Sequence, residues 1–221
     1  LGAPVITTTH SAGPWQRTFY APDMQPLQTE TSADMQLSHE YNARGQRTAT
    51  RASAPGLPTR TTAYAWRPHG SAGAGQIATL TNALGQQSRF EYDSAGRLAR
   101  HTLPDGRAIA YQRDASGNLT LLRTPAGVEH AFTWGEASLP ASYAAPQGGR
   151  TVWAHDAERK LTSITRPGGQ QVRLGYDSAA RLSTLSADGR TWQRRYNALG
   201  QLTAIEQQGS AADASHLHLD Y

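Results

Sequence analysis

The sequence has no cysteine, a single lysine, few charges and no long hydrophobic run. Without cysteine, the 221-residue chain has no disulfide framework and no thiolate for catalysis. No stretch approaches the roughly 18 consecutive apolar residues of a membrane-spanning helix, so no membrane span is expected. Only 17% of the residues are charged, whereas 21 glycines and 12 prolines supply many turn formers. This composition favours a β-protein with many turns over a helical bundle.

The positive charge comes almost entirely from arginine, since Lys160 is the only lysine. The net charge is +4 and the isoelectric point is about 9.6. A nucleic-acid-binding protein usually gathers its basic residues in runs or on one face. Here arginines such as Arg97, Arg107 and Arg190 are spread along the chain. We therefore expect solvated turn charges and no nucleic-acid partner.

One short turn sequence, at residues 92–98 (Tyr-Asp-Ser-Ala-Gly-Arg-Leu), recurs along the chain. An Asp that opens a four-residue turn and a Gly that closes it favour a type I turn. Its carboxylate is expected to accept hydrogen bonds from the backbone N–H groups two and three residues on. The flanking residues alternate between bulky apolar and polar or small, which indicates a β-hairpin. The predicted turn residues are Asp93, Gly96, Asp114, Gly117, Asp156, Asp177, Asn197 and Gly200.

Two further sets of residues repeat with the same period of 20 or 21 residues. One is a second glycine column, seven residues before each residue that precedes a turn: Gly85, Gly106, Gly127, Gly148, Gly169 and Gly189. The other comprises aromatic columns: Phe90, Tyr92, Tyr111, Phe132, Trp134, Trp153, Tyr176 and Tyr196. The aromatic columns have two interpretations, an internal packing surface or an exposed ligand-binding surface. The period predicts an all-β fold of repetitive antiparallel hairpins, about 21 residues each, that form a long twisted or spiral sheet.

The turn-glycine column is replaced by Ser138, Arg159 and Ala180 in three successive repeats. A non-glycine residue at positive φ costs about 1–3 kcal/mol. These three turns are therefore expected either to be of another type or to carry strain.

The repeat divides the chain unevenly. Residues 1–79 are predicted to form irregular strands, with one early repeat at 41–50 and a Gly/Pro-rich surface loop at about 67–76. Regular repeats are predicted over 80–221. We expect one continuous repeat domain that is a fragment of a longer polypeptide.

Few residues suggest chemistry. His216, His218 and Asp220 alternate and would share one face of a strand, but no fourth metal ligand is evident. His155 and Asp156 suggest an acid–base pair, yet the repeat places them in the aromatic column and in a turn. We therefore expect no catalytic residue, no metal, no cofactor and no enzymatic activity.

The motifs at 92–98, at Tyr176-Asp177 with Arg181-Leu182, and at Tyr196-Asn197 with Gly200 resemble the Rhs, or tyrosine-aspartate (YD), repeat family of bacterial polymorphic toxins. The same repeat occurs in animal teneurins. The resemblance covers residues 80–221 well. It implies a β-sheet ribbon that spirals into a hollow shell around a C-terminal toxin. The family's self-cleaving motif has no match here, so neither a protease nor a toxin is implied within this chain.

The resemblance also implies a role and partners. The chain would be a structural shell segment, secreted or delivered from bacteria in interbacterial competition, for example by type VI secretion. Its partners would be its own toxin or effector domain as cargo, the rest of the same polypeptide and secretion machinery. Open sheet edges would also permit self-association. The alternative is an extracellular binding module that recognises glycans or a cell-surface partner.

Overall fold

The computed structural model describes residues 5–8, 15–209 and 216–218. Within these residues the regular structure is β-strand, apart from one three-residue 3-10 helix, η1 (Glu136–Ser138). The chain divides into two compact units, residues 1–110 and 111–221, which we describe separately. The predicted all-β fold of antiparallel hairpins is confirmed.

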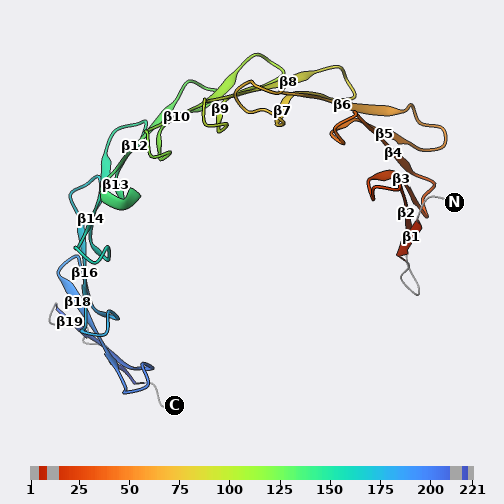
Figure 1. Cartoon of the computed structure of the whole chain (residues 1–221). Helices are drawn as coiled ribbons and strands as arrows, with labels where there is room; N and C mark the ends of the chain where they lie inside the picture. Colours follow the sequence, from red (N-terminus) through yellow and green to blue (C-terminus); the bar gives the residue numbers. More distant parts are fainter. Residues whose placement is uncertain (1–4, 9–14, 210–215, 219–221) are drawn as a thin grey trace. The chain divides into compact units, whose positions relative to one another are not determined.

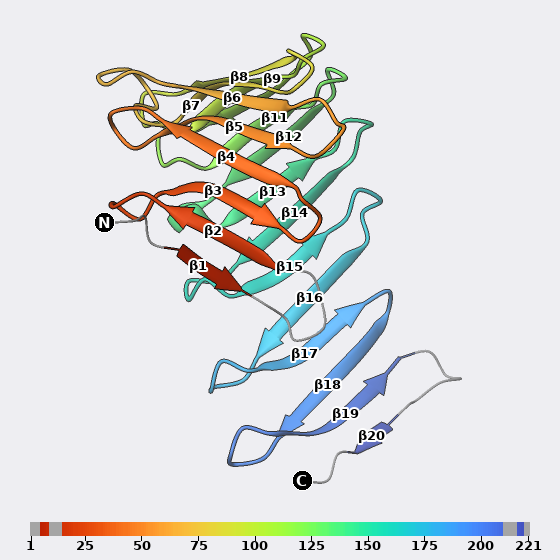
Figure 2. The same cartoon turned by 90° about the vertical axis from the view of Figure 1, so that its right-hand side faces the viewer.

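In the first unit, each strand pairs antiparallel with the next strand in the sequence, from β1 to the start of β10. Figure 2 shows β2 to β9 side by side in alternating directions, and Figure 1 shows them edge-on as a single layer. The strands are β1 (Val5–Thr8), β2 (Gln16–Tyr20), β3 (Pro26–Thr31), β4 (Gln36–Tyr41), β5 (Arg47–Ser53), β6 (Arg60–Trp66), β7 (Ile77–Thr81), β8 (Gln87–Tyr92), β9 (Leu98–Thr102) and β10 (Ala108–Arg113), which crosses the boundary between the units.

The second unit has the same order of pairing, from β11 to β20. Its strands are β11 (Leu119–Arg123), β12 (Glu129–Trp134), β13 (Pro140–Ala144), β14 (Arg150–His155), β15 (Leu161–Thr165), β16 (Gln171–Tyr176), β17 (Leu182–Ala187), β18 (Arg190–Tyr196), β19 (Leu202–Gln208) and β20 (His216–His218). The helix η1 lies in the connection between β12 and β13.

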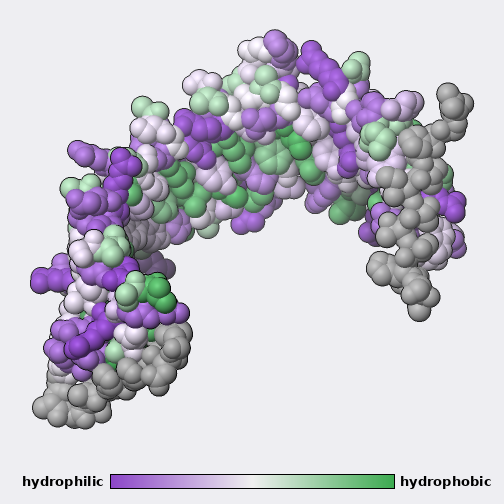
Figure 3. All heavy atoms as spheres, turned by 60° about the horizontal axis from the view of Figure 1, so that its bottom comes forward, coloured by the Kyte–Doolittle hydropathy of each residue, from purple (hydrophilic) through white to green (hydrophobic). Residues whose placement is uncertain are grey.

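The two faces of each sheet differ in composition because side chains alternate along a strand. On the apolar face, Phe90 lies opposite His101, and Trp153 lies opposite Ile164. On the polar face, Glu91 lies opposite Arg100, and Thr133 lies opposite Ser142. Figure 3 shows a band of hydrophobic residues on the face that it presents, with hydrophilic residues along the rims.

The sheets have little buried core. The buried residues in the described part of the chain are all small: Thr29, Ala49, Gly73, Ser142 and Ala204. No large side chain among the described residues is fully buried. In a single layer, each hairpin is therefore stabilised mainly by its two neighbours through ladder hydrogen bonds and cross-strand side-chain pairs.

The Gly/Pro-rich segment at 67–76 is a compact connection between β6 and β7. The Arg67 N–H donates to the Gln76 carbonyl at 2.8 Å and so closes the hairpin. Gly73 has φ +70°, and a Cβ added there would collide with the Tyr92 ring. This close approach requires glycine. The predicted domain boundary at residue 79 stays a prediction, although β2 to β7 pair in the same way as later strands.

Candidate functional site

The repeated turns close by one pattern of hydrogen bonds. In the turn after Tyr92, the Gly96 N–H donates to the Asp93 carbonyl at 2.9 Å, and the Asp93 N–H donates to the Arg97 carbonyl at 2.9 Å. Gly96 has φ +76°. This is a three-residue hairpin loop, a type I turn followed by a left-handed residue.

The Asp93 carboxylate accepts from one of the two expected backbone donors and from one that was not expected. Oδ1 of Asp93 accepts from the N–H groups of Ala95 at 3.0 Å and Arg97 at 2.9 Å, two and four residues on. The expectation of a donor three residues on was wrong. That N–H belongs to Gly96, which already bonds the Asp93 carbonyl. The backbone bond from Arg97 is the largest of the contributions that lower the pKa of Asp93.

A pairing rule that our sequence analysis missed links the first and fifth turn residues. Where the first residue is Asp, its Oδ2 accepts from the side chain of residue five. Where it is Asn, its Nδ2 donates to a Gln at residue five. The charged pairs are Asp93–Arg97 and Asp177–Arg181, both at 2.8 Å, and the amide pairs are Asn42–Gln46, Asn82–Gln86 and Asn197–Gln201, at 2.7 to 2.9 Å. Asp156 lies 4.0 Å from Lys160, and Asp114 accepts from Asn118 at 3.0 Å.

The three replaced turn glycines keep the left-handed conformation. Ser138 has φ 59°, Arg159 has φ 66° and Ala180 has φ 61°. Arg159 and Ala180 follow the strained alternative, because the N–H of each still donates to the carbonyl of the Asp three residues earlier, whereas the connection at Ser138 is of another type, in which the Leu139 N–H donates to the Glu136 carbonyl. In the η1 connection Ala137 also has positive φ, at 54°.

The second glycine column lies in the turns at the other edge of the sheets. All six residues have positive φ, between 75° and 90°. The column therefore marks left-handed turn positions and not a ligand-binding loop.

The aromatic residue before each turn lies at a β-bulge. The register shifts at this residue in eight hairpins of the described chain, so that two residues of the following strand oppose one. Opposite Tyr176 the extra residue is Ser183, whose hydroxyl donates to the Gly175 carbonyl at 3.2 Å. Thr162 and Thr203 make the equivalent bond.

Each Tyr or Trp at this bulge after residue 40 donates a hydrogen bond to the strand that begins the preceding repeat. Donor and acceptor are 2.7 to 2.9 Å apart, and the acceptor is always a backbone carbonyl. The pairs are Tyr41 with Pro26, Trp66 with Arg47, Tyr92 with Ile77, Trp134 with Leu119, Tyr176 with Leu161 and Tyr196 with Leu182. The bond explains why the position takes an aromatic ring with a terminal O–H or N–H donor.

The other aromatic residues lie two positions earlier and form the apolar face. Phe90 stacks on His101 with centroids 4.5 Å apart, and Phe132 stacks on Tyr143 at 5.1 Å. The Nε2 atom of His101 is buried without a hydrogen-bond partner. Tyr111 lies beneath the Arg113 guanidinium at 5.6 Å.

His155 and Asp156 line a cavity of about 280 Å³ together with Glu136, Pro140 and Trp153. The Asp156 carboxylate accepts from the Lys160 N–H at 2.8 Å, as a turn residue does. Thus the structure brings the two suspected acid–base residues to one cavity, with the carboxylate engaged in its turn.

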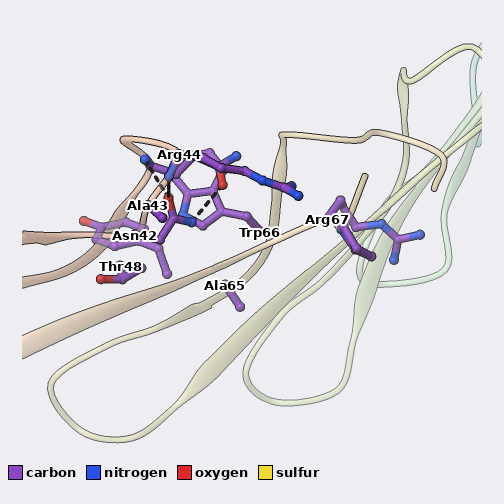
Figure 4. Close-up of a pocket in the computed structure, with 10 residues that line it drawn as sticks. Asn42, Ala43, Arg44, Thr48, Ala65, Trp66 and Arg67 are labelled. Carbon is purple, nitrogen blue, oxygen red and sulfur yellow. Dashed lines mark hydrogen bonds between the residues drawn. The ribbon is translucent and has the colours of Figure 1, made fainter. Parts of the chain in front are cut away.

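Another cavity, of about 340 Å³, lies between the turn after β4 and the end of β6. We call it the Trp66 cavity, and its lining residues are Asn42, Ala43, Arg44, Gln46, Thr48, Tyr64, Ala65, Trp66, Arg67 and Pro68. Figure 4 shows Trp66 beside Asn42 and Arg44, whereas the Arg67 side chain, just after the end of β6, points away from them. Sequence analysis did not single out this site, because Trp66 lies outside the regular repeats.

The weak metal candidate falls at the end of the chain. His216 and His218 lie in β20, and their side chains, like Asp220 as a whole, lie outside the described residues. In the part that the structure describes, no three His, Asp or Glu residues gather in a way that could hold a metal ion. No helix of that part has the length and apolar character of a membrane span.

Bulged antiparallel hairpins that recur every 20 or 21 residues, most of them with an aromatic donor at the bulge or an Asx residue in the turn, are typical of a YD-repeat sheet protein. The family model of the teneurin YD-shell matches residues 69–221, which is more than half of the chain. The chain belongs to this YD-shell family.

No curated protein matches the sequence. Among solved structures, the chain is similar to a crystal structure of TcdB2-TccC3-TEV, with 14% identity, a TM-score of 0.49, and coverage of 96% of this chain and 16% of that chain. It is similar to TcdB2-TccC3-Cdc42, with 14% identity, a TM-score of 0.46 and coverage of 87% and 13%. A third is the Tc holotoxin pore of Photorhabdus luminescens, with 14% identity, a TM-score of 0.42 and coverage of 92% and 15%. The chain spans less than a fifth of the length of these structures.

Proposed function

We propose that this chain is a wall segment of an Rhs-type bacterial toxin shell, which encloses a toxin or effector domain of the same polypeptide. Membership of the YD-shell family supports this role. The observation that carries the proposal is the single-layer sheet with one apolar face. Within the described part of the second unit, no second layer of this unit covers Phe132, Trp153 and their neighbours on this face.

Exposed apolar faces of this kind promote association between molecules in water. A closed shell keeps the apolar face on its inside, away from other molecules. Enclosure would also deny proteases access to the cargo until release. In this role the polypeptide is secreted or delivered by bacteria, with type VI secretion machinery as one partner, and acts in competition between cells. Open sheet edges at the ends of the segment would pair with adjoining repeats or with another copy.

We also propose that the segment has no catalytic role. The serines at turn positions, such as Ser94 and Ser116, lie where the repeat needs a small residue. Asp156, the carboxylate beside His155, is held by the Lys160 N–H of its own turn. Replacement of His155 by Ala is therefore expected to leave any hydrolytic activity of the full polypeptide unchanged.

The test is limited proteolysis of the full polypeptide, with the downstream part followed by mass spectrometry. We expect the downstream part to resist digestion in the wild type and to be digested once the wall is disrupted. Trp153→Ala, on the apolar face, should weaken protection. Val152→Ala is the matched control, because Val152 is the adjacent residue on the polar face and is 40% exposed.

Free digestion of the downstream part while residues 80–221 survive would refute enclosure. The chain would then be an open scaffold, and the binding module for glycans or a cell-surface partner would become the better proposal.

A further inference from the structure

The first unit contains a long segment without acidic residues. Between Glu40 and Glu91 the sequence has no Asp or Glu, although 17 occur in the whole chain. The same segment, residues 41–90, contains six arginines: Arg44, Arg47, Arg51, Arg60, Arg67 and Arg89. The arginines are therefore spread evenly along the chain, whereas the carboxylates are not.

Ion pairing does not neutralise this charge. Arg51 pairs with Glu40, just outside the segment. Within the described residues, no ion pair includes Arg44, Arg47 or Arg67. The unneutralised positive charge also acts on His39, whose pKa is lowered by burial and, to a smaller degree, by the charge of Arg47. The surface around β4 to β6 therefore has a positive potential that favours anions.

The Trp66 cavity lies in the middle of this segment and brings the Arg44 side chain together with two aromatic rings, while the Arg67 Nε–H donates to the Ala72 carbonyl at 3.1 Å in the following connection. Its lining includes Arg44, Arg67, Tyr64 and Trp66. The indole is fixed, because its Nε1–H donates to the Arg47 carbonyl at 2.8 Å. Asn42 is fixed too, because its side chain accepts from the N–H groups of Arg44 and Gln46 at 2.9 and 3.0 Å. The site is thus formed before any ligand binds, which reduces the entropic cost of binding.

We propose that the Trp66 cavity binds a carboxylate-bearing pyranose, such as a uronic acid residue of an acidic glycan. Indole and phenol rings offer a flat apolar surface with a polar edge, and a pyranose has an apolar C–H face with hydroxyls at its edge. A guanidinium binds a carboxylate through two parallel hydrogen bonds. Arg44 supplies this charge from an exposed turn, and the Thr48 hydroxyl lines the same cavity.

An acidic peptide fits the site less well. A peptide that binds a sheet usually adds a strand to a free edge. Here β5 is paired on both sides, with β4 and with β6, so neither strand edge beside the cavity is free. A cavity of about 340 Å³ accommodates one sugar ring, not a folded segment.

The test uses the full chain labelled with ¹⁵N and titrated with galacturonic acid oligomers, while the indole N–H signals are followed. The signal of Trp66 should shift and that of Trp134 should not. Trp134 is the matched control, since it occupies the equivalent repeat position and donates the same bond, at 2.7 Å, to the Leu119 carbonyl. The methyl-esterified oligomer, which has no charge, should bind at least about tenfold more weakly.

Arg44→Gln should weaken binding about tenfold. Arg44→Glu should abolish it. Arg166→Gln, which removes an exposed turn arginine of the second unit, should leave binding unchanged. In the absence of ligand, an unchanged far-UV circular dichroism spectrum and melting temperature in each variant show that the fold is intact.

Equal binding of the charged and esterified oligomers would overturn the proposal, as would full binding by Arg44→Glu. A poly-glutamate peptide that shifts the Trp66 signal as strongly as the oligomer would overturn the saccharide assignment. These outcomes do not depend on whether the downstream part is protected from proteases.

Discussion

The hydrogen bond that each bulge aromatic donates to the preceding repeat makes a measurable contribution to stability. In Tyr176→Phe the ring remains, and only the O–H that lies 2.9 Å from the Leu161 carbonyl is lost. Tyr176 is half-buried, so the carbonyl regains water only in part. A hydrogen bond of this kind contributes about 1 kcal/mol. For a chain of this length, that loss lowers the melting temperature by about 2–4 °C.

The assay is urea and thermal unfolding followed by far-UV circular dichroism. Tyr64→Phe is the control, because the structure gives the Tyr64 hydroxyl no hydrogen bond within the described residues. Tyr41→Phe with Tyr176→Phe should cost about 2 kcal/mol, since their acceptors, Pro26 and Leu161, lie in different hairpins with no shared partner. If Tyr64→Phe is as destabilising as Tyr176→Phe, the bond to the preceding repeat contributes nothing, and the explanation for the aromatic column fails.

Three other predictions concern the turns. Arg181→Gln should destabilise the chain because it removes the 2.8 Å bond to Asp177. The further change Asp177→Asn should restore stability, since it creates the amide pair found at Asn197 and Gln201. Equal melting temperatures of the single and double variants would contradict the pairing rule. Ala180→Gly should raise the free energy of unfolding by about 0.5–1 kcal/mol, because glycine adopts positive φ without strain. Gly85→Ala should lower it by about 1 kcal/mol, although the added Cβ meets nothing within 4 Å, because alanine is strained at positive φ. Urea unfolding measures both changes. Finally, the backbone N–H groups of Arg97 and Arg181 are the chief cause of the lowered pKa values of Asp93 and Asp177. The stability that these carboxylates contribute is complete above the unfolded-state pKa of about 4 and is lost as the pH falls through the lower folded-state values. The double variant Asp177→Asn with Arg181→Gln should therefore unfold at lower pH than the wild type in an acid titration, and an unchanged midpoint would refute this linkage.

Much of the fold could be predicted from sequence because the repeat is local. Asp93 and Gly96 define one turn through their own backbone preferences, and the 21-residue spacing places the next turn at the same edge. The β-bulge could not be predicted, since the extra residue, such as Ser183, is an ordinary strand residue. Only the pairing register shows that no residue of the neighbouring strand β16 lies opposite it.

The candidate binding site was missed for a different reason. Trp66 lies where the repeat pattern weakens, and the pattern of regular residues drew attention to 80–221. The site depends on Arg44, in the turn after β4, lying beside Trp66 at the end of β6, which residue spacing alone does not give. One signal was present in the sequence, namely the absence of Asp and Glu from residues 41–90.

The identity of the acceptors of the bulge aromatics affects how the number of repeats can change in evolution. They are carbonyls of Pro, Arg, Ile and Leu residues, so the bond makes no demand on the identity of the side chain. A repeat copied by unequal recombination finds a usable acceptor in whichever repeat precedes it. Chains of this kind can therefore lengthen or shorten by whole repeats without matched changes elsewhere, while the side chains of each repeat diverge on their own.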